Sequence, residues 1–220
     1  MGTTRLQLYN NALRMCGDRR IATLSDETES RRLLDDVWND GWIDEVLEAG
    51  FWKFAMKSQK FSYETSVTTS FGYQRAFLKP DDWIRPYAIC SDEFYRAPLL
   101  RYQDDGQYIF ADLDDIYVRY VSNGSTRGGD LSLWAGAFAD YAAAVGASKI
   151  IPKLTADKTR LDMILHSRSG LLAQNLSQAL NLDAMGEPQK FPALGSWVNS
   201  RGRRGGGPFG DGGATGSLIG

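Results

Sequence analysis

The spacing of apolar residues changes twice along the chain, and this change constrains the fold more than any other feature. Apolar residues recur every three or four positions up to Gly50, alternate with polar ones in short stretches to about residue 127, and then return to the first spacing. The wider spacing buries one stripe of a helix, whereas alternation buries one face of a strand. The sequence therefore predicts an α+β fold, a helical bundle with an inserted small antiparallel β-domain.

These changes divide the 220 residues into four expected parts, enough chain for one sizeable core. They are the N-terminal helices of the bundle (1–50), a β-rich insert (51–127), the C-terminal helices of the bundle (128–185) and an extended Gly/Arg-rich arm (186–220).

Four helices are expected in the bundle. Thr3 or Thr4 is a suitable N-cap for the first and Gly17 a suitable end, whereas Pro152 is expected to stop the third. The last helix carries a face of leucines, Leu161, Leu165, Leu172, Leu176 and Leu180. The expected helices span about residues 4–16, 26–49, 130–151 and 156–182.

The insert is expected to begin with a strand over 51–63, because Trp52, Phe54 and Met56 alternate with Lys53 and Lys57. Further strands are separated by turn sequences rich in Asp, Gly, Asn and Pro. They are expected at Ala76–Leu78, Ile84–Cys90, Leu99–Tyr102, Tyr108–Ala111 and Ile116–Val121.

The helix expected over 26–49 is strongly acidic, with nine carboxylates against two arginines. Four of the carboxylates recur at every fourth position and define an acidic face: Asp36, Asp40, Asp44 and Glu48. One interpretation is a face that is simply solvated, and the other is a channel surface that repels a polyanion.

Signatures of catalysis are scarce. His166 is the single histidine, and Cys16 and Cys90 are too far apart in sequence to suggest a metal motif, so buried, reduced thiols are expected. Zinc-protease, dithiol and nucleophile-elbow motifs are missing from the sequence. We therefore expect no catalytic residues, no metal site and no cofactor.

Adjacent carboxylates leave one enzymatic alternative, because glycan cleavage needs only two carboxyl groups. A virion-associated cell-wall-degrading enzyme could use such a pair, although turn formation and solvation are the simpler interpretations. The pairs are Asp35-Asp36, Asp81-Asp82, Asp104-Asp105 and Asp114-Asp115.

The arm is rich in glycine, which accounts for nine of the last twenty residues, and it carries isolated side chains suited to docking in a neighbour's grooves. Its arginines suit acidic grooves on a protein partner or, in a second interpretation, a nucleic acid. The expected binding residues are Phe191, Leu194, Trp197, Arg201, Arg203, Arg204 and Phe209.

Several stretches over about residues 5–180 together resemble the head-to-tail adaptors of tailed bacteriophages, called tail tubular protein A in short-tailed phages. They are "YNNALRMCGDRRIATL", "RRLLDDVWNDGWIDEVLEAGFWKFAM", "FLKPDDWIRPYAI", "YIFADLDDIYVRYVSN" and "FADYAAAVGASKI". The third is similar to the family's Leu-Pro-x-Asp-aromatic-x-Arg turn, except that Lys79 stands between Leu78 and Pro80.

The resemblance implies a structural subunit of the virion neck, made in the host cytoplasm. Neighbouring copies, commonly twelve, would form a ring beneath the portal protein and join it to a tail or nozzle protein. Genomic DNA would pass through the ring without specific binding. No membrane partner is expected, since no apolar run approaches the ~20 residues that a membrane helix needs.

Overall fold

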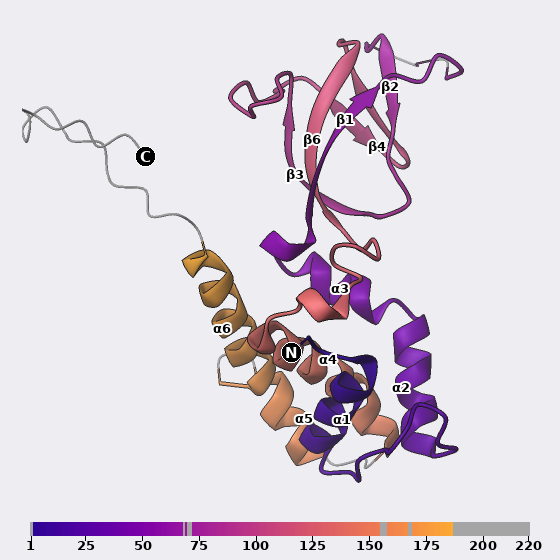
Figure 1. Ribbon diagram of the computed structural model, residues 1–220, viewed down its shortest axis with the longest axis vertical. Helices are drawn as coiled ribbons and strands as arrows, with labels where there is room; N and C mark the ends of the chain where they lie inside the picture. Colours follow the sequence, from indigo (N-terminus) through magenta and orange to yellow (C-terminus); the bar gives the residue numbers. More distant parts are fainter. Residues whose placement is uncertain (1, 68, 70–71, 155–157, 167–168, 187–220) are drawn as a thin grey trace, which may run out of the picture. The chain divides into compact units, whose positions relative to one another are not determined.

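The computed structural model of the protein describes residues 2–67, 69, 72–154, 158–166 and 169–186. It confirms an α+β fold, with helices and two small antiparallel sheets (Figure 1). In the described part, the helices are α1 (Arg5–Cys16), α2 (Glu29–Asn39), α3 (Trp42–Glu48), α4 (Gly136–Leu154), α5 (Lys158–Leu165) and α6 (Leu171–Met185). The strands are β1 (Met56–Ser62), β2 (Arg75–Leu78), β3 (Trp83–Cys90), β4 (Gln103–Asp105), β5 (Tyr108–Ala111) and β6 (Asp115–Ser122).

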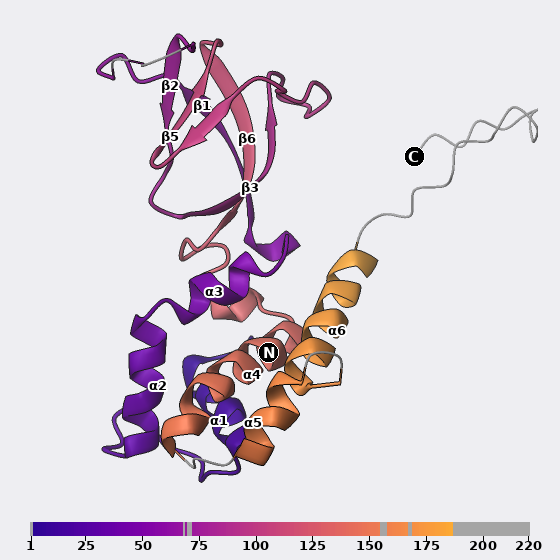
Figure 2. The same ribbon diagram turned by 180° about the vertical axis from the view of Figure 1, so that it is seen from behind.

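Helix α4 is the centre of the helical core. It packs against both α1 and α6, which lie beside it in both views (Figures 1 and 2). Its middle, residues 141–147, is entirely buried. A helix that is apolar nearly all round must be covered on several sides, and this explains why other helices gather around α4.

Helix α1 forms as its local sequence predicts. The side-chain oxygen of Thr4 accepts the backbone N–H of Gln7, and the Gln7 side chain accepts the N–H of Thr4, a capping box. At the other end Gly17 adopts φ 73°, the left-handed conformation that lets the chain leave a helix without a Cβ clash.

The single helix expected over 26–49 is wrong. The chain breaks at Gly41, whose φ of 87° is left-handed, and α2 and α3 lie on either side. Helix α2 also begins later than expected, at Glu29, because the side chain of Thr28 caps it by accepting the N–H of Arg31.

Two expectations for the C-terminal helices also need correction. Pro152 does not stop α4 but lies in its last turn, where only one helical hydrogen bond is lost. The last helix is two helices: α5 ends at Leu165, and Gly170 precedes α6. As a result Leu165 is 51% exposed instead of facing the core.

The strands form two three-stranded sheets, in the orders β1-β6-β3 and β2-β5-β4, and Figure 1 shows β6 between β1 and β3. Their shared core includes Phe77, Ile109 and Val118. One expected strand is wrong and another begins later than expected. Leu99–Tyr102 lies outside the strands, with Leu100 being 88% exposed, whereas the strand expected over 51–63 starts only at Met56, after a 3₁₀ turn at residues 53–55.

Candidate functional site

The four residues of the expected acidic face are all exposed, but they do not lie on one helix. The break at Gly41 divides them into two pairs. Asp36 is on α2 and Asp40 is the C-cap residue that follows it, whereas Asp44 and Glu48 are on α3. Members of each pair are four residues apart and therefore share one helix face. Asp44 is anchored, because its Oδ1 accepts a hydrogen bond from the Asn123 side chain at 2.7 Å.

Other carboxylates of the same helices are paired within the chain. Asp35 Oδ1 accepts hydrogen bonds from Arg5 at 2.7 Å and from the Tyr9 hydroxyl at 2.9 Å, and its Oδ2 pairs with Arg31. Burial is the main cause that raises the pKa of Tyr9, so this hydroxyl stays a donor. Glu45 pairs with a lysine of α4, Lys149. By contrast, the four exposed carboxylates of the expected acidic face form no ion pair among the residues that the structure describes. They are Asp36, Asp40, Asp44 and Glu48.

A second polar group of side chains surrounds Asp82, in the turn before β3. Its carboxylate accepts hydrogen bonds from Lys57 at 2.8 Å, the Tyr120 hydroxyl at 3.0 Å and the Ser122 hydroxyl at 2.6 Å. These donors come from β1 and β6, so one carboxylate joins the turn to two strands. Ser122 is fully buried and also accepts the N–H of Gly124, which starts the return of the chain toward the helices.

The charge of this group is stabilised by its hydrogen bonds. Burial raises the pKa of Asp82, but the bonds from Lys57, Ser122 and Tyr120 outweigh it and hold that pKa below its usual value. The bond to Asp82 likewise raises the pKa of Lys57. With each donor and acceptor satisfied, the arrangement is that of a structural clamp.

The adjacent carboxylates are likewise engaged with cations. In each of the four pairs at least one member bonds a lysine or arginine, as with Lys79 for Asp104 and Arg75 for Asp114. Asp115 bonds Lys60, and this hydrogen bond is the main cause that lowers its pKa. The pKa values of Asp82 and Asp115 are held below their usual value, whereas a general acid requires a raised pKa.

The remaining candidate residues are separate from one another. His166 follows α5, and its Nδ1 lies 2.9 Å from the Ser169 hydroxyl. Cys16 and Cys90 are buried free thiols, as expected. Within the described ranges, His, Cys, Asp and Glu form no group of three that could hold a metal ion.

The residues expected to make the arm a binding segment lie outside the described residues, which end at Gly186. They are Phe191, Leu194, Trp197, Arg201, Arg203, Arg204 and Phe209.

Comparisons with known proteins assign no family: no protein-family model matches the sequence, and no curated protein matches it as a relative. Among the helices in the described part of the chain, none combines the length and apolar character needed to cross a membrane.

Proposed function

We propose that this protein is a structural adaptor subunit that forms a ring beneath a bacteriophage portal and continues the DNA channel toward the tail. The observation that carries the proposal is the chain order of helices, β-insert and helices, which agrees with the order of the stretches that resemble the adaptor family. The insert leaves the helices after α3 and returns to them at α4.

The unpaired carboxylates of α2 and α3 support a role next to DNA that is not held. Exposed carboxylates repel phosphates over about 8 Å at physiological ionic strength. Wherever Asp36, Asp40, Asp44 or Glu48 borders the channel, DNA can pass without adhering. In a ring of about twelve copies the repulsion would repeat around the channel.

The arm supplies the contact with the portal or with the neighbouring copy in this proposal, with the portal ranked first. Its spaced aromatic residues and arginines would insert into grooves, and each contact would repeat around the ring. The β-insert would then be the part directed to the tail or nozzle protein.

The test is reconstitution on portal particles purified from the same phage, followed by negative-stain electron microscopy. The full chain is expected to add a ring below the portal. A chain truncated after Gly186 keeps α6 and its terminal hydrogen bond to Asp183, so it is expected to fold but not to attach. Triple alanine substitution at Arg201, Arg203 and Arg204 keeps the arm but removes its arginine side chains. Comparing this variant with the truncated chain shows how much of the attachment depends on the arginines.

Full-length protein that adds no density to portal particles refutes the proposed function. Truncated protein that attaches normally refutes only the role of the arm. The same preparations are assayed on purified peptidoglycan, because clearing of that substrate is what the alternative, a cell-wall-degrading enzyme, predicts.

A further inference from the structure

Asn123 and Gly124 begin the turn that leads from β6 back to the helices, and together they form a chemically labile pair. In a flexible chain, the backbone nitrogen of a glycine can attack the side chain of a preceding asparagine, because glycine has no Cβ to obstruct the approach. The reaction is a deamidation, since it releases the side-chain nitrogen as ammonia. Asn123 is the one asparagine in the sequence that glycine follows.

The reaction needs water as its only co-reactant. The backbone nitrogen of Gly124 loses its proton and bonds to Cγ of Asn123, the bond from Cγ to Nδ2 breaks, and ammonia leaves behind a succinimide ring. Water then opens the ring at either carbonyl carbon, which gives aspartate or isoaspartate at position 123. In total, one amide and one water are consumed, and one carboxylate and one ammonium ion are formed.

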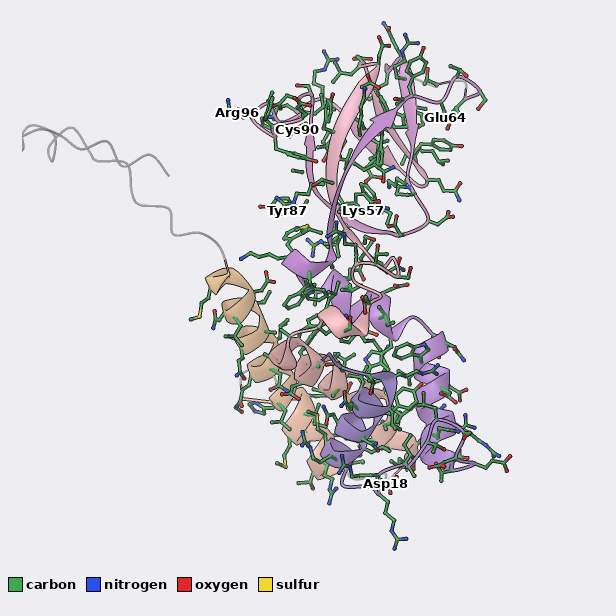
Figure 3. All side chains as sticks on the ribbon, viewed as in Figure 1. Asp18, Lys57, Glu64, Tyr87, Cys90 and Arg96 are labelled. Atoms are coloured by element: carbon green, nitrogen blue, oxygen red, sulfur yellow. The ribbon has the colours of Figure 1, made fainter. Side chains whose placement is uncertain are left out.

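The packing around Asp82 requires the glycine of this pair. A Cβ added to Gly124 would lie 3.1 Å from Oδ2 of Asp82 and 3.1 Å from Oγ of Ser122. Contacts this short would disturb the hydrogen bond of 2.6 Å that joins these two oxygens. They belong to the Asp82 clamp, which is Asp82 with its donors Lys57, Tyr120 and Ser122. Figure 3 shows Lys57 near the start of β1.

The asparagine is engaged as well. Its Nδ2 donates to Oδ1 of Asp44 on α3 at 2.7 Å, and its backbone N–H donates to the carbonyl of Asp82 at 3.1 Å. Asn123 therefore joins the return turn both to α3 and to the turn before β3. An aspartate at this position would face Asp44 with a second negative charge in place of a donor. The labile pair is thus the pair that the packing favours at both positions.

The same contacts oppose the reaction. Ring closure requires the nitrogen of Gly124 to be free, but its N–H donates to Oγ of Ser122 at 3.0 Å. The carbonyl of Gly124 accepts the N–H groups of Arg127 and Gly129, at 2.9 and 3.1 Å, which fixes the backbone of the turn. The departing amide of Asn123 is held by Asp44. Attack must therefore wait until the turn opens locally.

We propose that Asn123 is a guarded deamidation site, protected while the turn is closed and modified when the turn opens. The site goes beyond the proposed ring and does not depend on it. Modification would replace the donor to Asp44 by a carboxylate and would detach the return turn from α3. Because the reaction is irreversible, each opening of the turn adds to a permanent loosening of the place where the insert rejoins the helices.

The first test follows deamidation of the full chain by peptide mapping, with chromatography and mass spectrometry that resolve aspartate from isoaspartate. Folded and urea-unfolded samples are incubated at the same mildly alkaline pH. The folded chain is expected to react at Asn123 at least about tenfold more slowly, because the hydrogen bonds at Asn123 and Gly124 must first be lost. Asn175, which leucine follows, is the internal control and is expected to react slowly in both samples.

A second test removes one guarding contact from the folded chain. Asp44→Ala takes away the acceptor of the Asn123 side chain and is expected to speed deamidation about fivefold, the effect of one hydrogen bond. The matched control is Asp36→Ala, which removes an exposed carboxylate from α2 and is expected to leave the rate unchanged. Far-UV circular dichroism and Tm check that both variants are folded.

A third test exchanges the two partners of the hydrogen bond. Asn123→Asp reproduces the aspartate product and is expected to lower Tm by about 2–4 °C, because a hydrogen bond becomes a contact between like charges. Adding Asp44→Asn restores one donor and one acceptor with their roles reversed, so the double variant is expected to regain most of that loss.

Three results overturn the proposal. They are deamidation of Asn123 that is as fast in the folded chain as in urea, a rate in Asp44→Ala no higher than in Asp36→Ala, and an Asn123→Asp/Asp44→Asn variant no more stable than Asn123→Asp. If Asn123→Asp does not fold, the comparison of folded and unfolded wild-type chains still decides.

Discussion

Gly146 is the position at which one added methyl group would most directly test the packing of α3 on α4. A Cβ built on Gly146 would lie 2.5 Å from Cη2 and 2.8 Å from Cε2 of Trp42. The indole is 1% exposed and donates its N–H to the carbonyl of Ala142 at 3.0 Å, so a shift of the ring would disturb buried contacts and this hydrogen bond. Gly146→Ala must therefore displace either the ring or the helix.

Opposing effects decide the size of the change. Alanine gains about 1 kcal/mol over glycine in a helix interior. Overpacking a full core costs about 1–3 kcal/mol, and losing the Trp42 hydrogen bond costs about 1 kcal/mol more. The net expectation is a loss of about 1–3 kcal/mol in the free energy of unfolding, or about 4–8 °C in Tm for 2 kcal/mol.

The assay is urea unfolding followed by tryptophan fluorescence and far-UV circular dichroism. The matched control is Gly136→Ala in the same helix, where nothing lies within 4 Å of the added Cβ. It is expected to be neutral or stabilising by up to about 1 kcal/mol. If Gly146→Ala proves as stable as Gly136→Ala, the close contact between Trp42 and α4 is refuted.

Three further predictions follow from the buried polar groups. Asp82→Ala is expected to lower the free energy of unfolding by about 1–3 kcal/mol, because it leaves buried hydrogen-bond donors unpaired. Urea titrations should show the difference from the wild type shrinking as pH falls below about 4, because protonation of Asp82 then removes the stability that its lowered pKa provides. Asp35→Ala is expected to cost a similar amount, about 1–3 kcal/mol by urea unfolding, because two half-buried guanidiniums lose their carboxylate. Cys16 and Cys90 should resist Ellman's reagent until the protein is denatured, and because burial raises the pKa of Cys16 to about 12, stability should decline above about pH 9, where the unfolded thiol ionises first.

Helix α1 was predictable because its signals are local. A capping threonine and a closing glycine lie within a few residues of the helix they limit. The break at Gly41 was hidden by the surrounding pattern, since Leu34, Trp42 and Val46 face the core on both sides of it. The break between α5 and α6 was masked in the same way, by leucines that continue on both sides.

Sequence alone predicted which candidate residues are exposed, but not which of them are engaged by residues distant in the chain. Asp36, Asp40, Asp44 and Glu48 are exposed as their spacing suggests, but the engagement of Asp35 depends on Arg5, thirty residues away. The Asp82 clamp joins a turn to the strands β1 and β6. It contains no short motif, so only the tertiary structure brings its members together.

The pairing of β1 with β6 has a consequence for how such a chain can change over evolution. The insert leaves and rejoins the rest of the protein on adjacent strands, with Met56 opposite Val121, and both residues belong to the helical core cluster. Residues facing each other across antiparallel strands are about 5 Å apart, so a short hairpin could bridge them. Recombination could replace the strand segments beyond that point while the helices remain unchanged, if Ile84 of β3, which packs against the helical cluster, is kept.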